Sequence, residues 1–118
     1  MRRRSGTSVD SHFEGKVPHL KANYQRLLEV LHHLGPFQET AKQASIHLQK
    51  QTVFADVQLR KGYFNLEFKT DYPIDDPRIT KHLQLSAHRF AHTVRITVPT
   101  DIDTQLVAWL TDAYHLSK

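Results

Sequence analysis

The sequence predicts an α+β fold of two layers, in which an N-terminal and a C-terminal helix pack on one face of an antiparallel sheet of four to five strands. Two observations predict it. Residues 52–60 and 63–69 each alternate apolar and polar side chains around Lys61-Gly62, which is typical of a β-hairpin with one buried face. Apolar residues at helical spacing before and after the strand-rich region predict the two helices.

The first helix is expected to begin at Pro18, because proline suits the first helical position, and to end at Gly35-Pro36. The second is expected to begin at 100–103, with Thr100 as its N-cap and acidic residues in its first turn. The apolar stripes of the two helices are Leu20, Tyr24, Leu27, Leu28, Leu31 and Leu34, then Ile102, Leu106, Trp109, Leu110, Ala113 and Tyr114.

Alternation predicts strands over 45–49, 52–60, 63–69, 79–85 and 90–98, whereas 37–43 is ambiguous. The expected inward side chains are Ile46, Leu48, Val53, Ala55, Val57, Leu59, Phe64, Leu66, Phe68, Leu83, Leu85, Phe90, Val94, Ile96 and Val98. The expected polar face holds His47, Asp56, Gln58, Arg60, Tyr63, Asn65, Glu67, Lys69, His82, Gln84, Thr93, Arg95 and Thr97. Strand 79–85 or 45–49 is expected at a sheet edge, which leaves both a monomer and a homodimer open.

Length and composition predict one cytoplasmic domain over 13–118, preceded by a disordered basic leader over 1–12. Cysteine is absent, so disulfides, thiolate nucleophiles and cysteine-ligated metals are excluded. No apolar run approaches the roughly 20 residues of a membrane span, and the N-terminus lacks the apolar region of a secretory signal. The net charge is +4, and residues 1–10 carry +2 of it (three Arg and one Asp), so the rest of the chain carries +2.

The residues that could carry chemistry are scattered. We expect no metal, because His88 and His92 are four residues apart on a strand, roughly 13 Å, and no other histidine pair has ligand spacing. We expect no cofactor, because the sequence has four glycines and neither a Gly-x-Gly-x-x-Gly nor a Walker motif. Asp71, Asp75 and Asp76 are expected to be turn formers. His92 alternates with Phe90 and Val94. It is therefore either a core histidine hydrogen-bonded to a backbone carbonyl, to Tyr24 or to Tyr114, or a general base or ligand contact at the seam between sheet and helices.

A ligand site is predicted on the polar face. Lys42, His47, Arg60, Lys69 and Arg95 can gather there with Tyr63, and cations beside an aromatic ring can hold phosphate or a stacked base. An ordinary solvated sheet face has the same pattern.

The order of several short segments resembles an uncharacterised bacterial family that is catalogued as a domain of unknown function, some of whose members are labelled predicted transport proteins. The segments, which span residues 13–115, are Phe13-Glu-Gly-Lys16, Pro18-His-Leu20, Tyr24, Leu34-Gly-Pro36, Lys42, Ser45-Ile-His-Leu48, Phe54-Ala-Asp-Val57, His92-Thr-Val-Arg95, Asp101-Ile-Asp103 and Ala113-Tyr114. The resemblance implies a small soluble α+β domain with no established mechanism. Its matching candidates for a ligand site are Lys42, Ser45, His47, Phe54 and His92.

Three functions remain as hypotheses. The favoured one is a non-enzymatic binding module for a protein or a small anionic ligand. Nucleic-acid binding through the basic sheet face is the first alternative. The second is a small hydrolase or nuclease that uses His92 or His47 with a nearby carboxylate.

Overall fold

The computed structural model describes residues 9–117, which form two α-helices, six strands and two short 3-10 helices. Residues 1–8 of the expected leader lie outside the described part. The elements in chain order are η1 (Asp10–Phe13), α1 (Pro18–His32), β1 (Gln38–Ala41), β2 (Ile46–Gln49), β3 (Val53–Leu59), β4 (Phe64–Thr70), β5 (Ile79–Ser86), β6 (Arg89–Ile96), η2 (Pro99–Asp101) and α2 (Thr104–Leu116).

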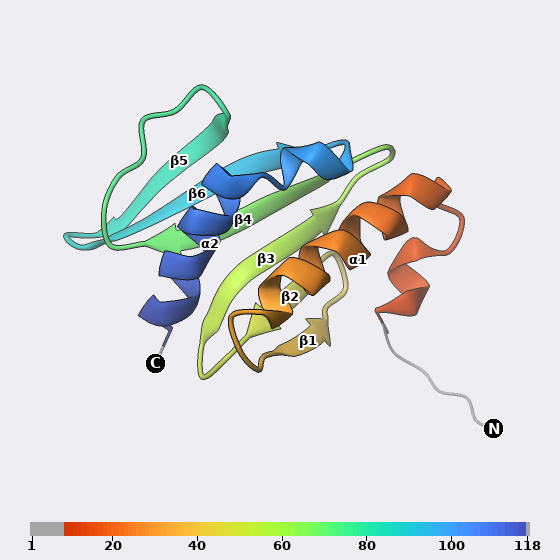
Figure 1. The fold of residues 1–118 in the computed structure, drawn as a ribbon, viewed down its shortest axis with the longest axis horizontal. Coiled ribbons are helices and arrows are strands. Elements are labelled where there is room, and N and C mark those ends of the chain that lie inside the picture. Colours follow the sequence, from red (N-terminus) through yellow and green to blue (C-terminus); the bar gives the residue numbers. More distant parts are fainter. Residues whose placement is uncertain (1–8, 118) are drawn as a thin grey trace.

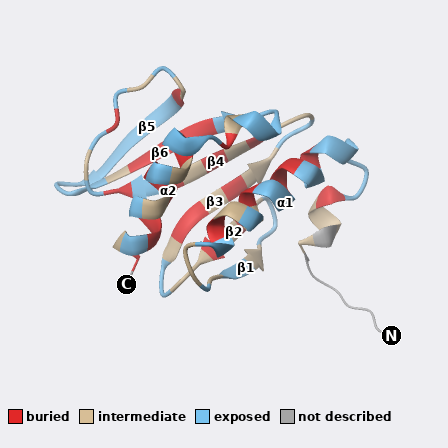
Figure 2. Ribbon diagram, in the orientation of Figure 1, coloured by how far each residue is buried: buried red, intermediate tan, exposed pale blue. Residues whose placement is uncertain are grey.

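The predicted two-layer α+β architecture is confirmed. All strand pairs are antiparallel, in the order β1-β2-β3-β4-β6-β5. Helices α1 and α2 lie on one face of this sheet, and no helix lies in front of β5 (Figure 1). Buried residues are concentrated where the helices meet the central strands, while β5 is coloured almost entirely as exposed (Figure 2). No helix in the described part of the chain is both long and apolar enough to cross a membrane.

The register explains why one face is buried. One row of directly opposed residues crosses all six strands on the helix side: Ala41, Ile46, Val57, Leu66, Val94 and Ile79. Five of the six are buried, and Ala41 at the β1 edge is partly covered. Because successive side chains point to opposite faces, the neighbouring row of residues is placed on the side without helices. We call that side the open face.

The sheet has six strands rather than four or five. The additional strand is β1, which falls in the ambiguous segment 37–43 and pairs with β2. The Tyr24 hydroxyl donates to Glu39 Oε1 at 2.7 Å, which ties β1 to α1. A four-residue polar strand has too little alternation to be recognised from its sequence alone.

The orientation predicted for most of β5 was wrong. Ile79 is opposite Val94 but Lys81 is opposite Thr93, so a bulge lies between them. A bulge adds one residue, which moves the following side chains to the other face. His82 and Gln84 therefore lie on the helix side, opposite His92 and Phe90, while Leu83 lies on the open face. Leu83 and Leu85 are 52% and 48% exposed rather than inward.

Two other inward predictions were also wrong. A register shift opposite Leu48 and Gln49 makes Phe54, only 2% exposed, a core residue beside Ala55, while Val53 is only partly buried. The ring of Phe54 packs edge-on against Phe37 and Tyr114. Val98 is 46% exposed because β6 ends at Ile96 and the chain turns into η2.

The helix ends differ from the sequence prediction. Helix α1 begins at Pro18 as expected, but its C-cap is His33, so Gly35 lies two residues beyond the cap. At α2 the N-cap is Asp103 rather than Thr100, and its side chain accepts from the Leu106 N–H at 2.9 Å. That hydrogen bond, together with the Arg78 guanidinium, holds the pKa of Asp103 below its usual range.

Candidate functional site

The open face of the sheet carries a continuous row of polar side chains. The strand register places Thr40, His47, Asp56, Glu67, Thr93 and Lys81 opposite one another, in that order, from β1 to β5. A second row beside it runs from Gln58 through Asn65 to Arg95. Sequence alternation predicted all of the second row, and His47, Asp56, Glu67 and Thr93 of the first, on the polar face. Thr40 and Lys81 were not predicted there, and His82 and Gln84, beyond the β5 bulge, were wrongly placed on it.

A hollow of about 260 Å³ lies on this face, and the polar side chains that line it are His47, Asp56, Glu67 and Lys69. Val53, Phe54, Ala55 and Phe68 complete its lining. Asp56 and Glu67 are directly opposed on β3 and β4, and Lys69 lies two residues along β4 from Glu67. The hollow therefore combines two carboxylates, an ammonium group and an imidazole.

His47 and Asp56 form the best-defined contact in the hollow. His47 Nε2 lies 3.6 Å from Asp56 Oδ1, and the two side chains are 30% and 19% exposed. Gln58 Nε2 donates to the other carboxylate oxygen, Oδ2, at 3.1 Å. Oδ1 is buried and accepts no hydrogen bond from any described residue. A buried acceptor without a hydrogen bond is costly, so Oδ1 favours any donor that comes within reach of it.

A cation–aromatic contact lies at the next position along the face. The Arg95 guanidinium carbon is 4.3 Å from the centre of the Tyr63 ring. Such a contact holds the long arginine side chain in place while its outer N–H groups stay available. The Arg60 backbone N–H donates to the Tyr63 carbonyl at 2.8 Å, which closes the turn between β3 and β4.

The model of the family described as "Domain of unknown function (DUF5655)" matches residues 9–117. The chain belongs to this family. No curated protein and no solved structure shows significant similarity to the chain.

The DUF5655 domain separates the predicted site residues into three groups. His47, Arg60, Tyr63 and Arg95 share the open face. Lys42 and Ser45 belong to the turn between β1 and β2, where the Lys42 N–H donates to the Ser45 carbonyl at 2.7 Å and Lys42 is exposed. His92 lies on the helix side of the sheet, opposite Phe68 on β4.

His92 is enclosed by its neighbours in the DUF5655 domain and is 1% exposed. The Thr70 hydroxyl donates to the Tyr72 carbonyl at 2.6 Å, so it accepts from His92 Nε2, 2.9 Å away. This arrangement places the proton of the neutral ring on Nε2. Nδ1 has no partner among the described residues. Burial lowers the pKa of His92 below its usual 6.5, and nearby His82 lowers it further, whereas the Tyr72 carbonyl opposes the shift.

The partner of His92 is thus neither Tyr24 nor Tyr114, which have other roles. Tyr24 donates to Glu39, and burial raises the pKa of its hydroxyl above the usual value, with Glu39 adding to the shift. Tyr114 donates to the Pro36 carbonyl at 2.7 Å. His92 packs against Phe68 and His82, with ring centres 5.5 and 5.7 Å away, as expected of a core histidine.

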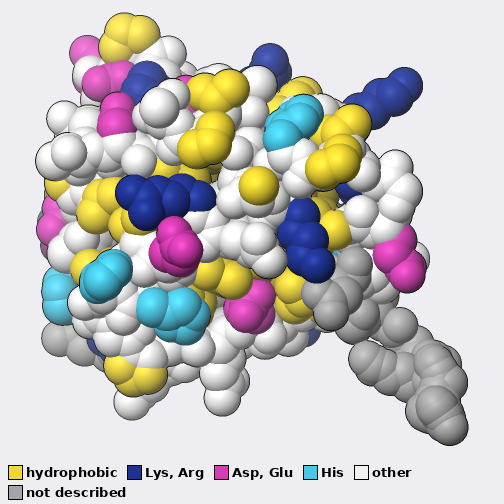
Figure 3. All heavy atoms as spheres, turned by 45° about the vertical axis from the view of Figure 1, so that its right-hand side comes forward, with side chains coloured by type: hydrophobic (Ala, Val, Ile, Leu, Met, Phe, Trp, Pro, Cys, Tyr) yellow, Lys and Arg dark blue, Asp and Glu magenta, His cyan; other side chains and the backbone are white. Residues whose placement is uncertain are grey.

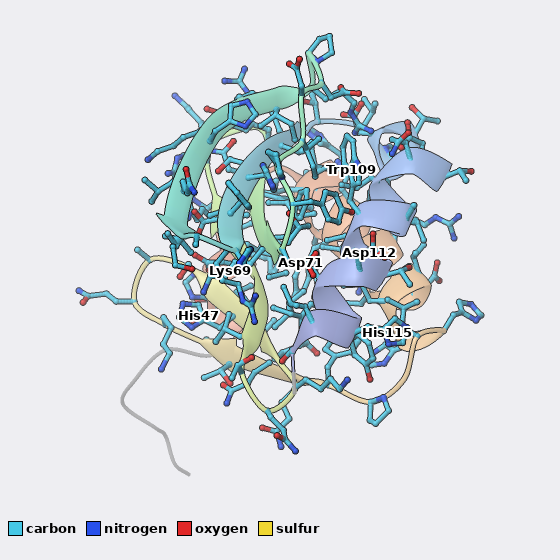
Figure 4. All side chains as sticks on the ribbon, turned by 90° about the vertical axis from the view of Figure 1, so that its left-hand side faces the viewer. His47, Lys69, Asp71, Trp109, Asp112 and His115 are labelled. Atoms are coloured by element: carbon cyan, nitrogen blue, oxygen red, sulfur yellow. The ribbon has the colours of Figure 1, made fainter. Side chains whose placement is uncertain are left out.

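Acidic residues occupy a different part of the DUF5655 domain. Asp71, Tyr72, Asp112 and His115 line a separate hollow of about 360 Å³, where the Tyr72 hydroxyl donates to Asp112 Oδ2 at 2.5 Å. In Figure 4, Asp112 and His115 project from α2, away from His47 and Lys69 on the strands. Asp76 accepts from the Arg78 N–H, as expected of a turn former. Within residues 9–117, no group of three or more His, Asp or Glu side chains is placed to hold a metal ion.

Charge on the helix side of the DUF5655 domain is dispersed. Figure 3 shows lysine and arginine side chains there separated by acidic, histidine and apolar ones. On the open face the count is five basic residues against two acidic ones: Arg60, Lys69, Lys81, Arg89 and Arg95 lie on the same face as Asp56 and Glu67. Lys69, Glu67 and Asp56 were predicted on the polar face, yet of the three only Lys69 was named as a candidate contact. Asp56 alternates in steps of two with Arg60, and Glu67 and Lys69 do so with Asn65. This spacing is the sequence feature that indicates a shared face.

Proposed function

We propose that this DUF5655 domain is a binding module and that the open face of the sheet holds a small anionic ligand that also carries a hydrogen-bond donor. The observation that carries the proposal is the hollow beside His47. It brings an imidazole and the Lys69 ammonium group together with a buried carboxylate oxygen that accepts no hydrogen bond. A sugar phosphate has both complementary features, because its phosphate is anionic and its hydroxyl groups are donors.

Charge supports an anionic ligand. Leaving the histidine aside, five basic groups against two carboxylates give the open face a net charge of +3. Asp56 is partly compensated by Gln58 and by His47. Arg95 lies on the row next to the hollow and is held against Tyr63, so it is in position for a second charge-assisted contact.

The test is an NMR titration of the ¹⁵N-labelled chain with glycerol phosphate, and with sodium chloride at matched ionic strength as the salt control. We expect saturable amide shifts in β2, β3 and β4 around the hollow. The combined variant His47→Ala, Lys69→Ala and Arg95→Ala should lose these shifts and keep its thermal midpoint, because all three side chains are partly or fully exposed.

A matched control variant changes the same three residue types on and beside α1: Lys16→Ala, Arg26→Ala and His33→Ala, all exposed. It should bind as the wild type does. Equal loss in both variants, or no saturable shift on the open face, would contradict the proposal. A labelled single-stranded oligonucleotide is titrated in parallel. Tighter binding of the oligonucleotide at the same residues, weakening steeply with salt, would instead favour the nucleic-acid hypothesis.

A further inference from the structure

Strand β5 presents an unusual sheet edge. It is the last strand in the order, so its outer side pairs with no described strand. Of its eight residues, only Ile79 is buried. Leu83 and Leu85 are 52% and 48% exposed, and Lys81 is the only lysine or arginine in the strand. Long edge strands are usually protected by charges or by a covering segment, because their free N–H and C=O groups accept a further strand.

The bulges of β5 leave a regular stretch in its middle. Register shifts lie between Ile79 and Lys81 and between Gln84 and Ser86. Bulges can protect an edge, but these two flank residues 81–84 and do not interrupt them. Within that stretch Lys81 and Leu83 are on the open face and His82 is on the helix side. Four residues are enough to pair with a short extended peptide.

The charged residues in and beside β5, over residues 77–100, are all basic. Residues 77–100 contain no Asp or Glu, although they contain four Lys or Arg and three His. Arg78 is already paired with Asp103, with Nη1 and Oδ1 2.9 Å apart. Lys81 and Arg89 remain exposed on the hairpin formed by β5 and β6. An acidic partner therefore meets Lys81 on the edge strand and Arg89 on the same hairpin, with no carboxylate within residues 77–100, whereas a second copy of the chain brings the same cations to its own β5.

We propose that β5 is a docking edge for an extended acidic segment of another protein, which adds to the sheet as an antiparallel strand. Backbone hydrogen bonds supply affinity in this mode, and alternate side chains supply specificity. Directly opposed residues share a face, so the segment should place an apolar residue opposite Leu83 and acidic residues opposite His82 and Lys81. Single-stranded nucleic acid is disfavoured, because it binds largely by stacking on aromatic rings and β5 contains no Phe, Tyr or Trp.

The probe is a fluorescein-labelled peptide with the central run threonine-valine-glutamate-glutamate, flanked by two serines on each side. The control peptide has lysine in place of both glutamates. Fluorescence anisotropy with the full chain should show saturable binding of the acidic peptide, weakened by salt, and no binding of the lysine peptide. Amide hydrogen exchange followed by NMR should show new protection within residues 81–84.

Two variants test the contacts separately. Lys81→Glu should weaken binding about tenfold, because an attraction becomes a repulsion. Leu83→Asp should abolish it by placing a carboxylate at the apolar contact. The matched controls are Lys61→Glu and Val98→Asp, which change an exposed lysine and an exposed apolar residue away from the β5 edge and should leave binding unchanged. Thermal melts check that each variant folds. If Leu83→Asp fails to fold, Lys81→Glu still decides the test.

Three results would overturn the proposal. One is equal binding of the acidic and the lysine peptide. Another is protection that appears in β2 and β3 but not in β5. The third is protection of β5 amides that rises with protein concentration alone, together with a dimer in sedimentation analysis, because the edge would then pair with a second copy. Loss of phosphate binding in the open-face variant has no effect on this test, since His47, Lys69 and Arg95 lie outside β5.

Discussion

Replacing Gly35 with alanine should destabilise the fold more than the same change at the other two glycines whose surroundings are defined. Gly35 has φ +144, and a Cβ built on it would lie 2.5 Å from the Tyr114 hydroxyl oxygen and 3.3 Å from its Cζ. Tyr114 is 3% exposed and its hydroxyl donates to the Pro36 carbonyl, so the ring cannot move without losing that bond.

The magnitude follows from two contributions. An alanine in this region of positive φ costs about 1–3 kcal/mol. Displacing the Tyr114 hydroxyl removes a hydrogen bond worth about 1 kcal/mol. Together they predict that Gly35→Ala lowers the free energy of unfolding by about 2–4 kcal/mol, measured by urea denaturation.

The other glycines are matched controls. Gly15 has φ +75 but open space around its Cβ position, so Gly15→Ala should cost about 1–2 kcal/mol from the backbone alone. Gly62 has no positive φ and nothing near, so Gly62→Ala should change stability by no more than about 0.5 kcal/mol. In a Tyr114→Phe background, Gly35→Ala should cost less than in the wild type. A Gly35→Ala variant as stable as Gly15→Ala would refute the close contact with Tyr114.

Two further predictions concern the core. Because burial lowers the pKa of His92, the unfolded chain binds a proton at this ring before the folded chain does, so stability should fall as the pH drops below 6.5, by up to about 1.4 kcal/mol per pH unit. His92→Gln should lack this part of the slope in urea curves between about pH 7 and pH 5, and parallel curves for the two proteins would rule the prediction out. Leu66→Ala should cost about 2–5 kcal/mol, whereas Leu83→Ala should cost less than about 0.5 kcal/mol, and equal losses would show that β5 is covered in solution.

The parts of the fold that could be predicted are those in which one periodicity runs without interruption. The β3–β4 hairpin and the apolar stripe of α2 follow simple rules of spacing, and the structure confirms both. A single residue inserted by a bulge moves the following side chains to the opposite face, so the spacing no longer predicts which of them are buried. The bulge before Lys81 reversed the orientation of Leu83, and the shift opposite Leu48 turned Phe54 into a core residue. Neither bulge has a glycine or another local sequence signal.

Tertiary contacts account for the remaining differences. Gly35 was predicted as a helix terminator, but the structure places Tyr114, from the far end of the chain, against it. For the site, alternation predicted which polar side chains share the open face. It could not predict that His47 and Asp56 meet 3.6 Å apart, because that depends on the register between β2 and β3.

The strand order has a kinetic consequence. Four of the five strand pairings join strands that are consecutive in the chain, so each can close over a short loop. Only the pairing of β4 with β6 joins strands that are not consecutive, because residues 71–88, which include β5, lie between them. Since the entropy lost on loop closure grows with loop length, that pairing should complete the sheet last during folding. Extra residues inserted in the loop between β4 and β5, residues 71–78, should slow folding without greatly changing the free energy of unfolding.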